Sequence, residues 1–268
     1  MRLNYIDNCD NLIGLKGLPD ACIDLTITSP PYDNLRTYNG FSWNQEGLIH
    51  ELYRVTKPGG VVVWIVNDAT MKGSETGTSF RQALCFKEAG FNIHDTMIWK
   101  KSGTPYPDKI RYQSNFEYMF VFSKGKPKTI HLIADKANIY ANTKIKQTER
   151  QKDGSVRRSS GSIKGRFVKE VGIRYNVWEV VEEKNNKTGH PAVFPEALVH
   201  DHIVSWSNPG DVVLDPFMGS GTTAAVCIKT GRQYIGFEIS EEYVQIAQQR
   251  AEESIRQMLA EEANMTWK

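Results

Sequence analysis

The stretch that decides the fold is residues 211–238, DVVLDPFMGSGTTAAVCIKTGRQYIGFE. DVVLDP is typical of a short buried strand, GTTAAVCIKTG of a helix that ends at a glycine, and YIGFE of a second strand. Gly219 and Gly221 allow the turn between them to pass close to a ligand, and the helix that follows begins with unpaired N–H groups. Glu238 ends the second strand, where a carboxylate can accept hydrogen bonds from ribose hydroxyls. This order of elements predicts half of a nucleoside-binding sheet, and a plain tight turn is the alternative.

The turn differs from two common nucleotide-binding loops. No Gly-Lys-Ser/Thr follows it, which excludes a P-loop. The third glycine of the dinucleotide fingerprint is missing as well. The ligand is therefore expected to be a nucleoside that is bound without either of those phosphate cradles.

A second motif, Thr28-Ser29-Pro30-Pro31-Tyr32, follows a predicted strand over residues 22–28. Two prolines end the strand and hold the backbone rigid, so the Pro30 carbonyl points outward instead of joining a sheet. The Ser29 hydroxyl lies beside it as a second acceptor, and Tyr32 offers a flat face for a planar ring. Two acceptors and a stacking surface suit the exocyclic amine of a nucleobase. The alternative is an ordinary proline-rich turn without a binding role.

Strands and helices alternate along the rest of the chain. Periodicity predicts helices over 48–55, from Pro195 onward and over 240–262, and strands over 61–66, 93–100 and 116–122. It also predicts a helix that is capped by Thr78 or Ser79 and ends near Gly90. Alternation of this kind predicts an α/β fold with a doubly wound, mostly parallel sheet covered on both faces.

Composition places the chain among globular proteins. It has 268 residues, of which 40% are hydrophobic and 24% charged. Four widely spaced cysteines without a CxxC pair argue against a disulfide framework or a zinc site and fit a reducing cytoplasm. No apolar run approaches the roughly 20 residues of a membrane span, and MRLNYIDNCD at the start has no signal-peptide core. We therefore expect a cytoplasmic protein with no membrane partner.

Charge is unevenly distributed along the chain. The net charge is +2, yet residues 124–169 hold 13 Lys and Arg against 3 Asp and Glu, which leaves −8 on the remainder. A basic segment on an acidic body suggests contact with a polyanion, because cationic side chains displace counterions from phosphates. A solvated or disordered loop is the alternative.

The two motifs, taken together and in this order, resemble those of a known family. SPPY at 29–32 and Phe217-Met218-Gly219-Ser220-Gly221 are similar to the [D/N/S]-P-P-[Y/F/W] and F-x-G-x-G motifs of the beta group of DNA amino-methyltransferases, which use S-adenosylmethionine. The similarity extends to residues 5–32, LYRVTKPGG (52–60), MIWKKSG…FEYMFVFSKG (97–125) and HPAVFPEAL (190–198).

The resemblance implies a Rossmann-like methyltransferase fold in three parts. Residues 1–123 would be the catalytic half, 124–187 an inserted target-recognition region that binds double-stranded DNA, and 188–268 the cofactor-binding half. The implied catalytic residues are Ser29, Pro30, Pro31 and Tyr32. The implied cofactor residues are Asp10, Asp215, Pro216, Phe217, Gly219, Ser220, Gly221, Thr222, Thr223 and Glu238, with His190, Pro191, Phe194 and Pro195 on the methionine side. Candidate DNA contacts are Arg36, Lys144, Lys146, Arg150, Arg157, Arg158, Lys164 and Arg166.

The expected chemistry follows from the amine. An exocyclic amine is a poor nucleophile because its lone pair is delocalised into the ring. Ser29 Oγ and the Pro30 carbonyl would draw its N–H bonds out of the ring plane and free the lone pair for attack on the methyl sulfonium. The base must first leave the duplex, at a few kcal/mol, of which stacking on Tyr32 would return about 1–3 kcal/mol.

Several alternatives stay open. Ser29, the SPPYxxLRxY context and HPAVFP favour the N4 amine of cytosine, but a neutral hydroxyl does not exclude N6 of adenine. A non-catalytic DNA-binding module with a degenerate cofactor site is an alternative of another class. A methyltransferase that acts on RNA or on a protein amide is a third interpretation. We expect no metal, because the helical spacing of His200-Asp201-His202 sends the two imidazoles to different sides. A protein that acts on DNA is expected to associate with the nucleoid. The existence of a cognate restriction endonuclease and the choice between monomer and homodimer are left open.

Overall fold

Residues 132–175 separate from the rest of the chain as a unit of their own. The computed structural model describes residues 1–31, 44–103, 109–145, 148–158, 166–181 and 194–265. One unit comprises residues 1–131 and 176–268, and the other comprises 132–175. The segment expected to be an insert, 124–187, is therefore divided, because its first and last stretches belong to the larger unit. Its role in DNA recognition stays a prediction.

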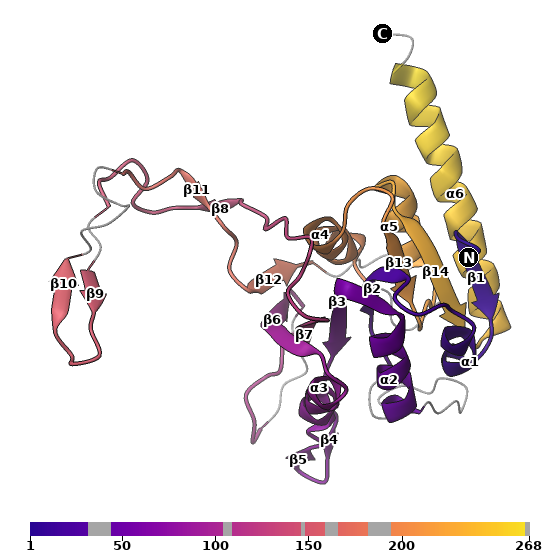
Figure 1. The fold of residues 1–268 in the computed structure, drawn as a ribbon, viewed down its shortest axis with the longest axis horizontal. Helices are drawn as coiled ribbons and strands as arrows, with labels where there is room; N and C mark the ends of the chain where they lie inside the picture. The colour runs from indigo at the N-terminus through magenta and orange to yellow at the C-terminus, as the bar shows by residue number, and fades with distance from the viewer. Residues whose placement is uncertain (32–43, 104–108, 146–147, 159–165, 182–193, 266–268) are drawn as a thin grey trace. The chain divides into compact units, whose positions relative to one another are not determined.

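The larger unit is built on a central sheet that has eight strands within the described residues (Figure 1). Their order is β1-β14-β13-β2-β3-β7-β6-β12, and neighbours are parallel except that β7 runs antiparallel to β3 and β6. This confirms the predicted mostly parallel sheet. The strands are β1 (Tyr5–Asn8), β2 (Ile23–Thr28), β3 (Thr56–Val66), β6 (Asn92–Lys101), β7 (Phe116–Ser123), β12 (Val177–Val180), β13 (Val212–Asp215) and β14 (Gln233–Glu238), and a small hairpin joins β4 (Thr70–Met71) to β5 (Ser74–Glu75).

Helices cover both faces of the sheet, as expected of a doubly wound fold (Figure 1). From β2 the chain winds outward to β3, and from β13 it winds the opposite way to β14. Right-handed crossovers in opposite directions place their helices on opposite faces. On one face α1 (Asn11–Lys16), α2 (Gln45–Val55) and α3 (Thr78–Glu88) pack in succession, and on the other α4 (Glu196–Trp206), α5 (Thr222–Lys229) and α6 (Glu241–Met265) do so. No helix in the described ranges is both long and apolar enough to cross a bilayer.

An aromatic core fills the layer between the sheet and helices α1 to α3. Phe86 of α3 stacks on Phe122 of β7 with ring centroids 4.1 Å apart, and Trp64 of β3 meets Phe86 edge-on at 5.0 Å. The Trp64 indole N–H donates to Gln82 at 2.8 Å, so its polar atom is satisfied. Burial of each such ring stabilises the fold by about 1.5–3 kcal/mol.

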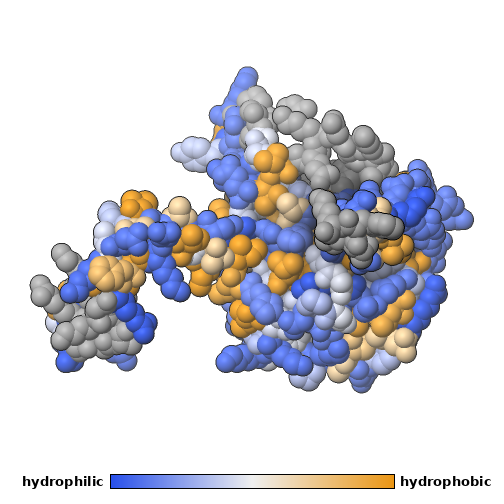
Figure 2. Space-filling model, turned by 90° about the horizontal axis from the view of Figure 1, so that it is seen from above, coloured by the Kyte–Doolittle hydropathy of each residue, from blue (hydrophilic) through white to orange (hydrophobic). Residues whose placement is uncertain are grey.

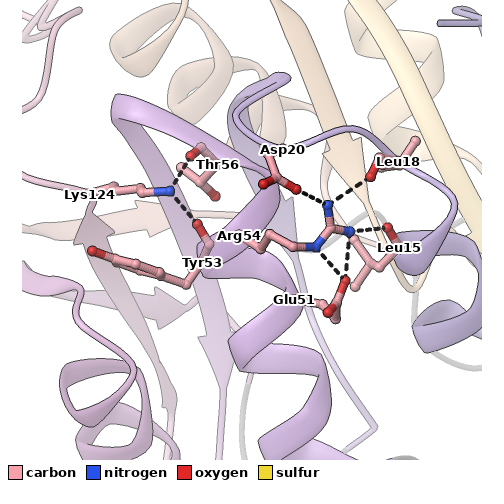
Figure 3. Close-up of polar contacts among 8 residues, drawn as sticks. All are labelled: Leu15, Leu18, Asp20, Glu51, Tyr53, Arg54, Thr56 and Lys124. Carbon is pink, nitrogen blue, oxygen red and sulfur yellow. Dashed lines mark hydrogen bonds and ion pairs between the residues drawn. The ribbon is translucent and has the colours of Figure 1, made fainter.

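Arg54 of α2 fixes the position of α1 (Figure 3). Its guanidinium donates to the carbonyl oxygens of Leu15 and Leu18, each at 2.8 Å, where α1 ends. Ion pairs with Asp20 at 2.6 Å and Glu51 at 2.7 Å hold the guanidinium in place. The last carbonyls of a helix lack their regular intrahelical partner, and Arg54 supplies a donor to Leu18 and a second donor to Leu15, whose carbonyl also accepts from the Leu18 N–H at 2.9 Å.

Lys124 makes a similar contact at the end of α2 (Figure 3). Its ammonium donates to the carbonyl oxygens of Tyr53 at 2.7 Å and Thr56 at 2.9 Å. The charge pattern predicts that Lys124 opens the basic insert, but in the structure it serves the larger unit as a helix-terminating contact.

Two element boundaries differ from those predicted. β3 begins at Thr56, not at residue 61, because Thr56 pairs with Ile23 and a register shift accommodates the Lys-Pro-Gly-Gly stretch. Helix α3 is capped neither by Thr78 nor by Ser79: Gly77 precedes it, and the Asp68 carboxylate accepts from the Ser79 N–H at 2.9 Å.

The smaller unit consists mainly of a two-stranded ribbon. β8 (Lys136–Ala137) pairs antiparallel with β11 (Val171–Gly172), and β9 (Thr148–Arg150) pairs antiparallel with β10 (Val156–Arg158). Between these pairs the two arms are bridged at Lys144 and Phe167. The chain therefore runs out along one arm of the ribbon and returns along the other.

Candidate active site

The two sequence motifs lie on neighbouring strands. β2 and β13 pair in parallel through Leu25 with Val213 and Thr26 with Leu214. The SPP residues follow the end of β2, and the glycine turn follows the end of β13, at the same edge of the sheet. Because the chain winds away from these two strands in opposite directions, this is the edge at which open α/β sheets bind ligands.

Asp215, the last residue of β13, joins the motifs directly. Its Oδ1 accepts from the Thr28 hydroxyl at 2.6 Å and from the Phe217 N–H at 3.0 Å, and its Oδ2 accepts from the Thr223 hydroxyl at 2.6 Å. The residue is 2% exposed. Burial raises the pKa of Asp215 to about 6, although the three hydrogen bonds act to lower it, and Glu238 raises it further. The predicted place of Asp215 in the cofactor pocket stays a prediction, and its contacts show that it supports the turn from within the chain.

Glu238, the last residue of β14, holds the turn from the other side. Its two carboxylate oxygens accept from the N–H groups of Gly219 and Ser240, each at 2.9 Å. Burial raises the pKa of this carboxyl above its usual range. Each carboxylate oxygen can accept more than one hydrogen bond, so Glu238 keeps capacity for ribose hydroxyls.

The glycines of the turn are required by backbone conformation and by packing. Gly219 has φ 52° and Gly221 φ 81°, in the left-handed region that L side chains rarely adopt. A Cβ on Gly221 would lie 2.8 Å from both Cα and Cβ of Ala247 in α6. Pro216 and Ser220 of the same turn are buried. The turn therefore packs directly against α6, and only a glycine at position 221 leaves room for this contact.

Arg250 supports the start of α5, and the sequence motifs gave no sign of it. It lies in α6 and donates to the Thr222 hydroxyl at 2.8 Å and to the Glu196 carboxylate at 2.8 Å. Glu196 also pairs with Lys229 at 2.6 Å, so α4, α5 and α6 are tied together beside the turn. An arginine in the middle of an amphipathic helix has no local signature, and only the fold reveals its partner.

Asp10 lies at the end of β1, next to β14, and begins α1. Its carboxylate accepts from the N–H groups of Leu12 at 2.9 Å and Ile13 at 3.2 Å, which makes it the helix N-cap. The neighbouring Asn8 side chain donates to the Glu238 carbonyl at 3.0 Å, so the ends of β1 and β14 are joined. Asp10, two residues beyond the end of β1, and Glu238, at the end of β14, therefore lie at the same sheet edge, and the predicted contact of Asp10 with adenosine stays a prediction.

The remaining predicted residues are only partly described. Ser29 and Pro31 are half-buried and Pro30 is buried, directly after β2. Phe194, half-buried, and Pro195, buried, precede α4. Lys144, Arg150, Arg157 and Arg166 are exposed on the smaller unit, where Arg158 belongs to β10. Residues outside the described ranges are Tyr32, Arg36, Lys146, Lys164, His190 and Pro191.

The two histidines of α4 occupy different environments, as predicted. His202 is buried, stacks on Trp178 at 4.5 Å and lies 3.3 Å from the Met119 sulfur, whereas His200 is exposed beside Asp201. Across the described part of the chain, no group of three or more His, Cys, Asp or Glu side chains is arranged to hold a metal ion.

The arrangement suits a nucleoside that carries a reactive group. The Glu238 carboxylate ends β14, and the Asp10 carboxylate caps α1 just after β1. Helix α5 presents its N-terminus beside the turn, and the rigid SPP segment begins one residue beyond the Thr28 contact with Asp215. One sheet edge thus holds three kinds of group. Carboxylates could accept from ribose, the N–H groups of α5 could bind an anion, and Ser29 and Pro30 offer two acceptors for an amine.

Comparison with known proteins identifies similar chains. The family described as DNA methylase matches residues 23–249. The orphan methyltransferase M.BamHII of Bacillus amyloliquefaciens is 56% identical over 243 residues, which cover 88% of this chain and 91% of that one. The DNA adenine methyltransferase YhdJ of Escherichia coli (strain K12) is 29% identical over 245 residues, 90% and 80% of the two chains. The solved PvuII DNA methyltransferase (cytosine-N4-specific) has a TM-score of 0.66 at 23% identity, covers 93% of this chain and 88% of its own, and supports the fold.

Proposed function

Because this chain belongs to the DNA methylase family, we propose that it transfers a methyl group from S-adenosylmethionine to the exocyclic N4 amine of cytosine in double-stranded DNA. The observation that carries the proposal is the meeting of the two motifs at one sheet edge. Thr28, directly before Ser29, is 2.6 Å from Asp215, directly before the glycine turn. Donor and acceptor sites are thereby brought onto adjacent strands.

The residues at this edge fit S-adenosylmethionine, the cofactor of this family. Glu238 at the end of β14 and Asp10 just after the neighbouring β1 are carboxylates suited to the hydroxyls and amine of adenosine. The amides at the start of α5, beside Thr222, suit a carboxylate because a helix N-terminus attracts negative charge. When bound, the cofactor supplies a methyl group on a positively charged sulfur.

Ser29 and Pro30 prepare the acceptor amine. Both offer oxygen acceptors, the serine hydroxyl and the proline carbonyl, at a point where proline prevents the backbone from entering the sheet. Hydrogen bonds from the amine to two acceptors reduce the delocalisation of its lone pair into the ring. Positioning of this kind supplies up to roughly 7–11 kcal/mol toward the barrier in favourable cases. The base is extruded from the duplex, because a stacked amine does not reach such a pocket.

Cytosine is proposed over adenine on the basis of Ser29. A serine at the first position of the motif resembles the N4-cytosine members of the family. The relatives include an adenine methyltransferase by name, and a structural neighbour is cytosine-N4-specific by name, so N6 of adenine remains the second candidate. M.BamHII is an orphan methyltransferase by name, and a cognate endonuclease is no part of this proposal.

The smaller unit is proposed to recognise the DNA. It carries 11 Lys and Arg against 4 Asp and Glu, and a two-stranded ribbon of this kind fits the major groove of B-DNA. Large hydrophobic side chains are exposed among the cations, including Ile139 at 92% and Tyr140 at 72%. Figure 2 shows hydrophobic side chains interspersed with hydrophilic ones over this unit, at the left of the view. Cations would contact phosphates, and the apolar groups would contact base edges such as thymine methyls.

A methyl-transfer assay tests the proposal. Methyl-labelled S-adenosylmethionine is incubated with the full chain and unmethylated genomic DNA, with RNA as a competitor. We expect label in DNA and a large loss of transfer in Ser29→Ala. Binding of DNA without transfer would favour the non-catalytic module, and preferential labelling of RNA or protein would contradict a DNA substrate.

The DNA-recognition role has its own test. Replacement of Arg150, Arg157 and Arg166 together by Gln should weaken DNA binding. It should also flatten the dependence of binding on salt, by about one unit of slope for each phosphate that is no longer neutralised. Unchanged affinity and slope would contradict the assignment.

A further inference from the structure

One buried carboxylate has no part in the proposed chemistry. Both oxygens of Asp215 face residues of the chain, and they connect three elements at once. Oδ1 accepts from Thr28 at the end of β2 and from the Phe217 N–H of the turn, and Oδ2 accepts from Thr223 at the start of α5. Two of these contacts are hydroxyl-to-carboxylate bonds of 2.6 Å, the length of a strong charge-assisted bond.

We propose that Asp215 is a positioning residue for methyl transfer, which holds the strand that carries Ser29 at a fixed distance from the glycine turn and α5. This inference rests on the proposed function. In a transfer between two bound groups, misplacement by about 1 Å lowers the rate by about 100-fold. β2 and β13 are already paired, but the register extends only to Thr26 with Leu214, so Thr28 and Asp215 continue the connection beyond the ladder.

The ionisation of Asp215 gives the proposal a second readout. Burial is the largest cause that raises the pKa of Asp215, and the charge of Glu238 raises it as well, whereas the hydrogen bonds from Thr223, Thr28 and the Phe217 N–H lower it. The pKa of the buried Cys227 thiol in α5 is raised by burial and by Asp215. Removal of the Thr28 donor therefore raises the pKa of Asp215 further. A proton on this carboxyl removes an acceptor from one of its donors and weakens the connection.

The chain supplies a closely matched control for Thr28. Thr26 lies two residues earlier on β2, on the same face, and both residues are 0% exposed. In the part of the chain that the structure describes, the Thr26 hydroxyl has no hydrogen-bond partner. Thr28→Val and Thr26→Val are thus the same chemical change at equally buried positions, and only one of them removes a bond to Asp215.

The experiment measures kcat, the Kd for S-adenosylmethionine and the pH–rate profile of the full chain. We expect Thr28→Val to lower kcat by about 10-fold to 100-fold, with little change in Kd, and to move the acid limb of the profile to higher pH. Thr28→Ser, which keeps the hydroxyl, should restore both, and Thr26→Val should behave as wild type.

Each other outcome overturns the proposal. It fails if Thr28→Val has the kcat of Thr26→Val, if the loss lies wholly in cofactor affinity, or if Thr28→Ser does not restore activity. Should Thr28→Val not fold, Thr28→Ala removes the same donor with a smaller side chain and is held to the same readouts, with Thr26→Ala as its control. An inactive wild-type protein would instead refute the proposed function, which keeps the two failures distinct.

Discussion

Substitution of Gly221 by alanine tests how tightly the turn packs on α6. The expected loss of stability has two parts. At φ 81° an L side chain costs about 1–2 kcal/mol. The new Cβ would also lie 2.8 Å from the Cα of Ala247, a backbone atom that cannot swing away, and overpacking of this kind costs about 1–3 kcal/mol more.

Gly210 provides the control for the first part alone. Its φ of 87° is nearly the same, and a Cβ there would meet nothing within 4 Å. Gly210→Ala should therefore show the backbone cost only. The difference between the two variants, about 1–3 kcal/mol, isolates the contact between the turn and α6.

Urea denaturation and calorimetric titration with S-adenosylmethionine measure the two effects. We expect Gly221→Ala to be less stable than Gly210→Ala. It should also bind the cofactor at least about tenfold more weakly, because a displaced turn that loses about 1.4 kcal/mol of binding free energy raises the Kd tenfold. Equal stability and equal cofactor affinity in the two variants would refute the reasoning.

Three individual side chains give further tests. Glu238→Gln leaves one carbonyl where two oxygens accepted N–H groups, so the Kd for S-adenosylmethionine should rise by about 10-fold to 100-fold in calorimetry, and an unchanged Kd would exclude Glu238 from the site. The pKa of Asp215 is raised to about 6 from 3.8, so between these values the folded state binds a proton that the unfolded state does not, and this group's contribution to the unfolding free energy rises as the pH falls. Activity should nevertheless fall below pH 6, because the protonated carboxyl loses an acceptor. Initial rates and thermal unfolding over the same pH range check this, and a parallel loss of activity and of this contribution to stability would contradict the sign. Arg54→Met should lower the unfolding free energy by about 1–3 kcal/mol in urea, because the Leu18 carbonyl loses this donor and the Leu15 carbonyl keeps only the Leu18 N–H, with kcat little changed; full stability would show that water replaces the guanidinium.

The main architecture was predictable because its signals are local. The strand, glycine turn and helix over 211–231 each have a signature within a few residues, and the structure places β13 and α5 there. Among the elements that periodicity did not predict, β1 and β12 of the central sheet are four residues each, too short to show alternation. β12 also lies in a segment whose polar composition resembles a loop, although Trp178 within it is buried against His202.

The site was predictable in its residue types but not in its connections. Asp215 was expected at the cofactor pocket because of its motif, yet its hydroxyl partner Thr28 is 187 positions away in the chain. Arg250 reaches Thr222 only because α6 folds back across α5. Contacts of this kind depend on the crossing of elements, which no local pattern encodes.

The central claim, that Ser29 and the glycine turn form one site for amine methylation of cytosine, is tested most directly by the chemical identity of the product. Genomic DNA from a host that lacks other methylases is collected after expression of the chain, digested to nucleosides and examined by mass spectrometry. We predict N4-methylcytosine, absent when Ser29→Ala is expressed instead. N6-methyladenine alone would contradict the choice of base, and no methylated nucleoside at all would contradict the account.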